Sequence, residues 1–133
     1  MTEPSPYIRL YLAEYASVFP DGTVTMVRGF INHWTTSAIP QLLQPYMVVD
    51  MSSPAAAQRE RDFTFGIKGP SGLQVAAVGG RFSRSAEVCA QYAIPLSFQV
   101  VEYGRHTLEL RCEDLVGALS LDVRPPHRTE TSP

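Results

Sequence analysis

Apolar and polar side chains alternate along the last third of the chain in three successive runs. The runs span Ala93–Val100, Thr107–Glu113 and Ala118–Val123. Because successive residues of a β-strand project to opposite faces of a sheet, each run predicts a strand with one buried face. Short polar segments separate the runs, so we expect the three strands to form an antiparallel meander.

The earlier part of the chain has the same character. The segment Pro20-Asp21-Gly22 is a turn signal, since proline presets φ and glycine accepts a positive φ. The alternation slips at Gly29, which indicates a bulge or bend, and the segment 69–72 predicts a hairpin. The strands expected here are Tyr7–Ala16, Thr23–Trp34, Leu42–Asp50, Arg61–Lys68 and Leu73–Phe82, the third of them buried on both faces.

About seven to eight strands with regularly spaced turns and no strong helix predict an all-β fold, an antiparallel β-sandwich with an Ig-like or C2-like appearance. A closed barrel is the alternative. Trp34 does not lie between two suitably spaced cysteines, so the immunoglobulin signature itself is absent. We expect one domain over residues 7–124, disordered tails at 1–6 and 125–133, and loops at 52–58 and 83–91.

In each expected strand, the alternation of apolar and polar residues (its phase) predicts which side chains are buried. We expect the core to contain Phe63, Phe65, Leu96, Phe98, Leu108, Leu110, Leu119 and Leu121, with Cys112 in phase beside them as a reduced thiol.

Charge excludes several classes of partner. The net charge is −2 and only 18% of residues are charged, so neither nucleic acid nor an anionic membrane is an expected ligand. No apolar run approaches the ~20 residues that span a bilayer. The first six residues lack the features of a signal peptide, which favours a cytoplasmic protein.

No pattern in the chain predicts catalysis, a metal or a cofactor. The histidines His33, His106 and His127 are scattered and are expected at the surface or rim, and the two cysteines, Cys89 and Cys112, have no metal-binding spacing. The serines show no nucleophile elbow, and nothing indicates a cleft with paired carboxylates. We therefore expect a protein that is not an enzyme.

Several short motifs resemble a family of small bacterial single-domain proteins of unknown function. They are the segments 13–16, 20–24, 27–30, 94–96 and 103–110, which together carry a strand, an Asp-Gly turn, a glycine-bearing strand and a terminal meander. The segment 112–115 departs from that family, in which a tighter polar Asp-Gly turn is usual. The resemblance implies a fold and carries no catalytic or binding residue.

Tyrosines recur along the first strand on the face opposite its aliphatic residues. This row suits a partner-binding surface, because tyrosine supplies a large contact area at low entropic cost, although a central strand buried on both faces would carry the same pattern. The candidate partner-binding residues are Tyr7, Arg9, Tyr11, Tyr15 and Trp34.

These observations favour a non-catalytic interaction or assembly module whose partner is another protein or a second copy of the chain. A β-sandwich that binds a small ligand or a carbohydrate through tyrosine and tryptophan is the alternative, and an enzyme of unrecognised type is the third reading. The strands Tyr7–Ala16 and Leu42–Asp50 carry few charges and are the expected sheet edges, and a homo-oligomer is expected to bury the tyrosine row.

Overall fold

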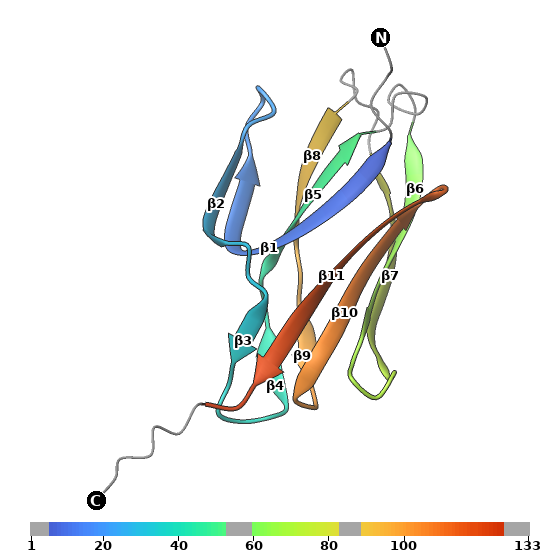
Figure 1. The fold of residues 1–133 in the computed structure, drawn as a ribbon. Coiled ribbons are helices and arrows are strands. Elements are labelled where there is room, and N and C mark those ends of the chain that lie inside the picture. The colour runs from blue at the N-terminus through green and yellow to red at the C-terminus, as the bar shows by residue number, and fades with distance from the viewer. Residues whose placement is uncertain (1–5, 53–59, 83–88, 127–133) are drawn as a thin grey trace, which may run out of the picture.

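A computed structural model describes residues 6–52, 60–82 and 89–126. The described residues form eleven strands and no helix, which confirms an all-β fold. The number of strands is larger than expected because three of them have only three residues, too few for alternation to be visible in the sequence. The strands are β1 (Tyr7–Val18), β2 (Val24–Gly29), β3 (His33–Thr35), β4 (Gln41–Leu43), β5 (Tyr46–Ser52), β6 (Arg61–Lys68), β7 (Gln74–Phe82), β8 (Cys89–Pro95), β9 (Phe98–Val100), β10 (Gly104–Cys112) and β11 (Leu115–Arg124), as labelled in Figure 1.

Two larger sheets and one small sheet make up the described part of the fold. One has the order β2-β1-β5-β8, the second β3-β11-β10-β6-β7, and the third pairs β4 with β9. Every pairing is antiparallel except that of β3 with β11. Each sheet is open at both ends, so the described strands form no closed barrel.

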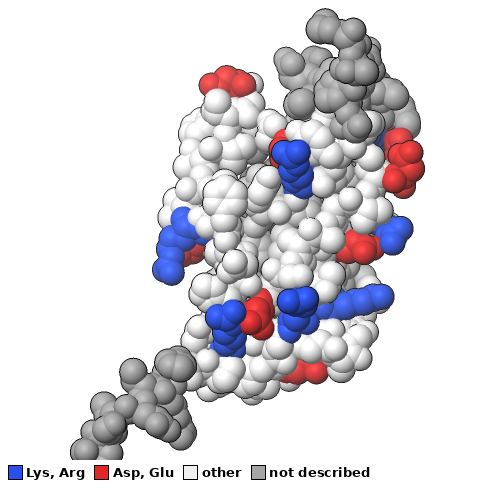
Figure 2. All heavy atoms as spheres, viewed as in Figure 1, with Lys and Arg blue, Asp and Glu red and all other residues white. Residues whose placement is uncertain are grey.

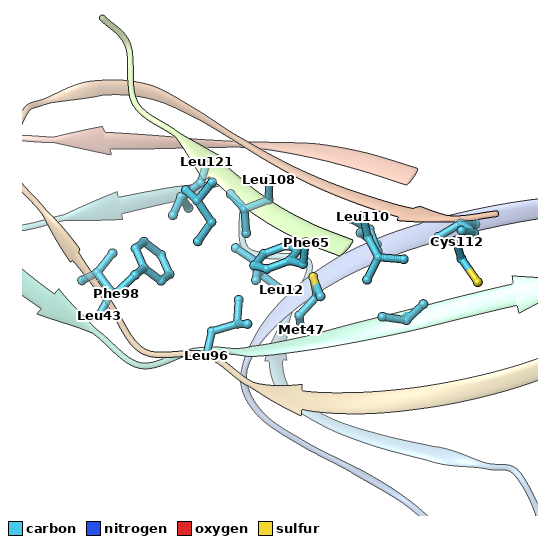
Figure 3. Close-up of a cluster of buried hydrophobic side chains, with 14 of the residues drawn as sticks. Leu12, Leu43, Met47, Phe65, Leu96, Phe98, Leu108, Leu110, Cys112 and Leu121 are labelled. Carbon is cyan, nitrogen blue, oxygen red and sulfur yellow. The ribbon is translucent and has the colours of Figure 1, made fainter. Parts of the chain in front are cut away.

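The main core lies between the two larger sheets. Leu12 and Met47 enter it from one sheet, and Phe65, Leu108 and Leu110 enter it from the other (Figure 3). Cys112 is fully buried in phase with them, as expected. The predicted core residues are buried except for Phe63 and Leu119, which are half-buried.

One side of this two-layered arrangement is closed. Strand β1 packs against β11, where a Cβ on Gly117 would lie 2.5 Å from Cγ2 of Ile8. The missing side chain at this glycine therefore lets the two sheets approach each other. The opposite side carries β8 and β7.

Strand β1 changes partners along its length. Its first half pairs with β5 and its second half with β2, so the end of β1 and β2 form a hairpin arm at the edge of the four-stranded sheet, drawn in blue in Figure 1. Gly22, at φ 86°, makes the predicted turn. The bend predicted at Gly29 is confirmed: β2 ends there, and Arg28 and Phe30 have φ of 50° and 59°. A second apolar cluster contains Ala13, Ala16 and Val48.

Two predictions about strand positions are wrong. Strand β5 is internal, because it lies between β1 and β8. Strand β1 lies between β2 and β5 in the sheet order, although β5 pairs with its first half and β2 with its second half. The edges of the two larger sheets are β2, β8, β3 and β7. Strand β5 is buried on both faces, as expected, whereas on the tyrosine face of β1 Arg9 and Tyr15 are exposed and Tyr7 and Tyr11 are half-buried.

The expected meander is confirmed only in its second half. Strands β10 and β11 pair antiparallel, but the other neighbour of β10 is β6. The first run of the expected meander is divided between two strands: β8, which pairs with β5, and β9, which pairs with β4. The hairpin of β6 and β7 is confirmed. Strand β8 begins at Cys89, so the loop expected at 83–91 is wrong over its last three residues, and 83–88 lie outside the described residues.

Candidate interaction surface

The free edges of β7 and β8 lie on the open side of the two-layered fold. Strand β7 pairs only with β6 and strand β8 only with β5, so each has backbone N–H and C=O groups that no described strand uses. β7 carries no charge between Gln74 and Gly80, and β8 carries none along its whole length. Natural edge strands are commonly protected by lysine or inward-facing charge. These two edges lack that protection.

An apolar groove, which we call the lateral groove, runs between these two edges. One part has a volume of about 320 Å³ and is lined by Ala76, Val78 and Ile94 among others, with no charged residue in its wall. The next part, of about 560 Å³, is lined by Val18 and Tyr92 among others. Phe63 and Ile94 line both parts, so the two parts adjoin each other.

Three stacked aromatic rings form the base of the lateral groove. The ring of Phe82 stacks on Phe63 and on Tyr92, with 4.4 Å between ring centroids in each pair. The stack joins β6 and β7 of one sheet to β8 of the other. The Tyr92 hydroxyl is buried and has no hydrogen-bond partner among the described residues.

Small residues on β7 keep this edge open. A Cβ on Gly80 would lie 2.5 Å from Cζ of Phe63, so the absence of a side chain there makes room for the aromatic stack. Val78 is 54% exposed although it projects toward the apolar side of the sheet, because no strand lies beyond β7 to cover it. An exposed aliphatic side chain in this position is what an added strand would bury.

The charges near the lateral groove are neutralised locally. Arg81 donates from Nε to Oδ1 of Asp62 at 2.9 Å and lies 3.4 Å from a carboxylate oxygen of Glu60. The hydrogen bond to Asp62, with the attraction of both carboxylates, raises the pKa of Arg81 above its ordinary value. Figure 2, which views the face carrying β11, likewise shows acidic and basic side chains interspersed, without a large area of one sign.

A second hollow of about 490 Å³ lies on the outer face of the sheet that contains β7. Gly66, Ala77 and Gly79 form its small-residue floor, and Lys68 and Arg111 contribute to its walls. Arg111 is already paired with Glu109 at 2.7 Å. No aromatic side chain projects into this hollow as a stacking platform; Phe65 contributes to its lining from a side chain that is buried on the opposite face.

The tyrosines singled out from the sequence lie in separate aromatic contacts. The Arg9 guanidinium carbon is 4.3 Å from the ring centroid of Tyr7. The rings of Tyr11 and Phe30 meet edge to face at 5.3 Å, and those of Tyr15 and Tyr46 do so at 5.0 Å. Tyr15 is 47% exposed. The row is thus occupied, in large part, by contacts within the chain.

Trp34 lies in the other sheet, on β3, and does not line a hollow together with the tyrosines. It packs against the main core and lines a hollow of about 400 Å³ with Glu14, Arg28 and His33 among others. A ligand platform built from both tyrosine and tryptophan is therefore not assembled among the described residues.

The histidines differ in their surroundings. His33 is exposed, with Nδ1 2.9 Å from Oδ1 of Asn32. His106 is fully buried, which contradicts the expected surface position; it shares the phase of Leu108 and Leu110, so alternation directs it into the core. Its Nδ1 lies 3.1 Å from the carbonyl oxygen of Gly104, and its Nε2 has no partner among the described residues.

The part of the chain that the structure describes holds no group of three or more side chains suited to a metal ion. It also holds no helix long and apolar enough to cross a membrane. His33 and His106 do not converge, since one is at the surface and the other is inside the core.

Sequence reasoning missed the residues of the lateral groove. The signal was present in Gln74–Gly80, a run of small and apolar residues without a charge. Gly79 and Gly80, at the end of this run, both lie within β7. No family model matches this chain, and a search of curated proteins gives no match.

Proposed function

We propose that this protein is a non-catalytic interaction or assembly module, built on a β-sandwich, that binds an extended segment of polypeptide along β7 and the lateral groove. The observation that carries the proposal is the pair of edge strands β7 and β8, each with one side unpaired among the described strands and with Arg81 as their single charge, and the adjoining hollows between them. Addition of a strand to such an edge supplies main-chain hydrogen bonds for affinity. Alternate side chains of the added strand supply specificity.

The chemistry of the groove defines the segment that it would accept. Its wall near Val78 and Ile94 contains no charged group, so a charged side chain entering it would lose hydration without gaining a partner. The fitting segment is extended, has an apolar residue at every second position and lacks proline over the paired stretch, because proline removes a donor from the ladder.

The tyrosine row is a weaker support for binding than the lateral groove. Tyr11 and Tyr15 already make edge-to-face contacts with Phe30 and Tyr46, which a partner would have to replace or extend. Backbone groups on the free edge of β7 have no such contacts among the described strands.

A peptide-binding experiment tests this proposal. Fluorescently labelled peptides of about eight residues, the length of an ordinary strand, would be titrated with the protein and followed by anisotropy. One peptide alternates valine with threonine, a second has the same composition with its valines clustered, and a third carries a central proline. The proposal predicts the tightest binding for the alternating peptide and loss of binding for the peptide with proline.

Variants locate the binding site. Ile94→Lys introduces a charge into the lateral groove and should weaken binding of the alternating peptide at least tenfold. Val116→Lys changes a residue that is 46% exposed on β11 and should leave that affinity unchanged. Equal binding of all three peptides, or an Ile94→Lys protein with undiminished affinity, would contradict the proposal.

A further inference from the structure

The edge strand β7 has a sequence that can pair with itself. In an antiparallel arrangement centred on Val78, this residue faces its own copy, Ala77 faces Gly79 of the second copy, and Ala76 faces Gly80 of the second copy. All of these residues are uncharged and small or β-branched. In this register no bulky or like-charged side chains of the two β7 strands therefore face each other.

Charge supports the same arrangement. The single charged residue of β7, Arg81, would face Val75 of the second copy, so the two arginines stay at opposite ends of the paired segment. Each Arg81 is already held by Asp62 of its own chain at 2.9 Å and therefore needs no partner from the other copy. Like charges directly opposite each other, the usual obstacle to pairing of edges, do not occur in this register.

Of the two free edges, β7 is the better suited to a second copy. Every residue from Ala77 to Arg81 is exposed. Strand β8 ends in Pro95, which has no N–H donor, and the second half of β1 packs beside it. Pairing of β7 with β8 of another copy would also have to form twice to close a dimer, whereas pairing of β7 with β7 is isologous and closes a dimer with one pairing.

We infer that the partner at β7 is a second copy of this chain, paired antiparallel through β7 about a twofold axis at Val78. This inference rests on the proposed function and names the occupant of the edge. Pairing would join the two five-stranded sheets into one and cover Val78, which is 54% exposed in the single chain. An extended peptide then competes with the second copy for the same edge.

The first test is the molar mass in solution, measured by light scattering and by sedimentation. The wild-type chain, of 14.7 kDa, should have twice that mass and should dissociate on dilution. Val78→Lys sets two ammonium groups against each other at the twofold axis and should give a monomer. Val116→Lys, the matched control on an internal strand, should remain a dimer.

The second test fixes the register. An equimolar mixture of Val78→Lys and Val78→Glu should restore the dimer as a heterodimer, because opposite charges now face each other at this position. Mild oxidation of Val78→Cys should link two chains through residue 78, and peptide mass mapping should find that bond. The Val116→Cys control should give no link through residue 116.

The outcomes separate this inference from the proposed function. A wild-type monomer that binds the alternating peptide, or a Val78→Lys protein that dimerises as tightly as wild type, would overturn self-pairing through β7 and leave the proposed function standing. A monomer that binds none of the peptides would overturn both.

Discussion

Gly117 shows how one absent side chain sets the distance between two sheets. A Cβ at this position would lie 2.5 Å from Cγ2 of Ile8 and 3.0 Å from its carbonyl oxygen. A side-chain atom can move, but the backbone oxygen of a strand that is paired with β5 has little freedom to do so. The residue is therefore required by packing and not by its backbone angles.

Replacement of Gly117 by alanine should destabilise the fold. We expect Gly117→Ala to lower the free energy of unfolding by about 1–3 kcal/mol, the usual cost of overpacking, measured by denaturant unfolding. The matched control is Gly66→Ala, also within a strand, where a Cβ would meet its nearest neighbours at 3.6 and 3.7 Å, ordinary contacts. Equal stabilities of the two variants would show that β1 and β11 are not in close contact.

Asp21 lies in the turn between β1 and β2, and its hydrogen bonds shift the pKa of its carboxyl group. Its Oδ1 accepts hydrogen bonds from the Thr23 hydroxyl at 2.6 Å and from the Thr23 backbone N–H at 3.0 Å. These two donors favour the ionised form and lower the pKa of Asp21, the hydroxyl contributing most. A lowered pKa in the folded state stabilises the turn above the unfolded-state pKa, and that stabilisation is lost as pH falls through the folded value.

Removal of the hydroxyl should raise the pKa of Asp21 toward its ordinary value. Thr23→Val keeps the backbone donor and the β-branched shape, so the rise should be partial. An NMR titration of the side-chain carboxyl carbon measures it directly. An Asp21 pKa that is the same in Thr23→Val and wild type would mean that the hydroxyl does not donate to this carboxylate in solution.

At the scale of elements, the β10–β11 hairpin supplies much of the core, and its alternation made it predictable from sequence. Leu108, Leu110 and Leu121 are fully buried, in the expected phase. His106 has the same phase and is buried for the same reason, so the pattern outweighs the usual surface preference of histidine. Which strands pair with each other could not be predicted in the same way, because alternation defines the two faces of a strand but not its neighbours in the sheet.

Shortening a core side chain in the β10–β11 hairpin tests which face of the hairpin is buried. Leu110→Ala should lower the free energy of unfolding by about 2–5 kcal/mol, because it leaves a cavity in the core. Val116→Ala, at a residue that is 46% exposed on β11, should change it by about 0.5 kcal/mol or less. Coincident denaturant midpoints for Leu110→Ala and wild type would mean that the hairpin presents its opposite face to the core.

At the scale of the whole molecule, the all-β class, the turns and most of the core could be predicted from local pattern. The sheet order could not. Few charges on β5 suggested a free edge, but the same pattern arises when a strand is covered by neighbours on both sides, as β5 is by β1 and β8, and only tertiary structure distinguishes these cases. The lateral groove requires β7 and β8, which belong to different sheets, to lie on the same side, and no local pattern contains that relation.

The central claim is that the free edge of β7 is a binding site, and residue-resolved amide hydrogen exchange tests it most directly. In an antiparallel strand alternate amides point toward each neighbour, so every second amide of β7 faces away from β6. With the edge occupied, these amides should be protected in the wild-type protein and should exchange much faster in Val78→Lys, while the amides of β10 remain unchanged. Fast exchange of the same amides in wild type, both alone and with the alternating peptide, would contradict the account.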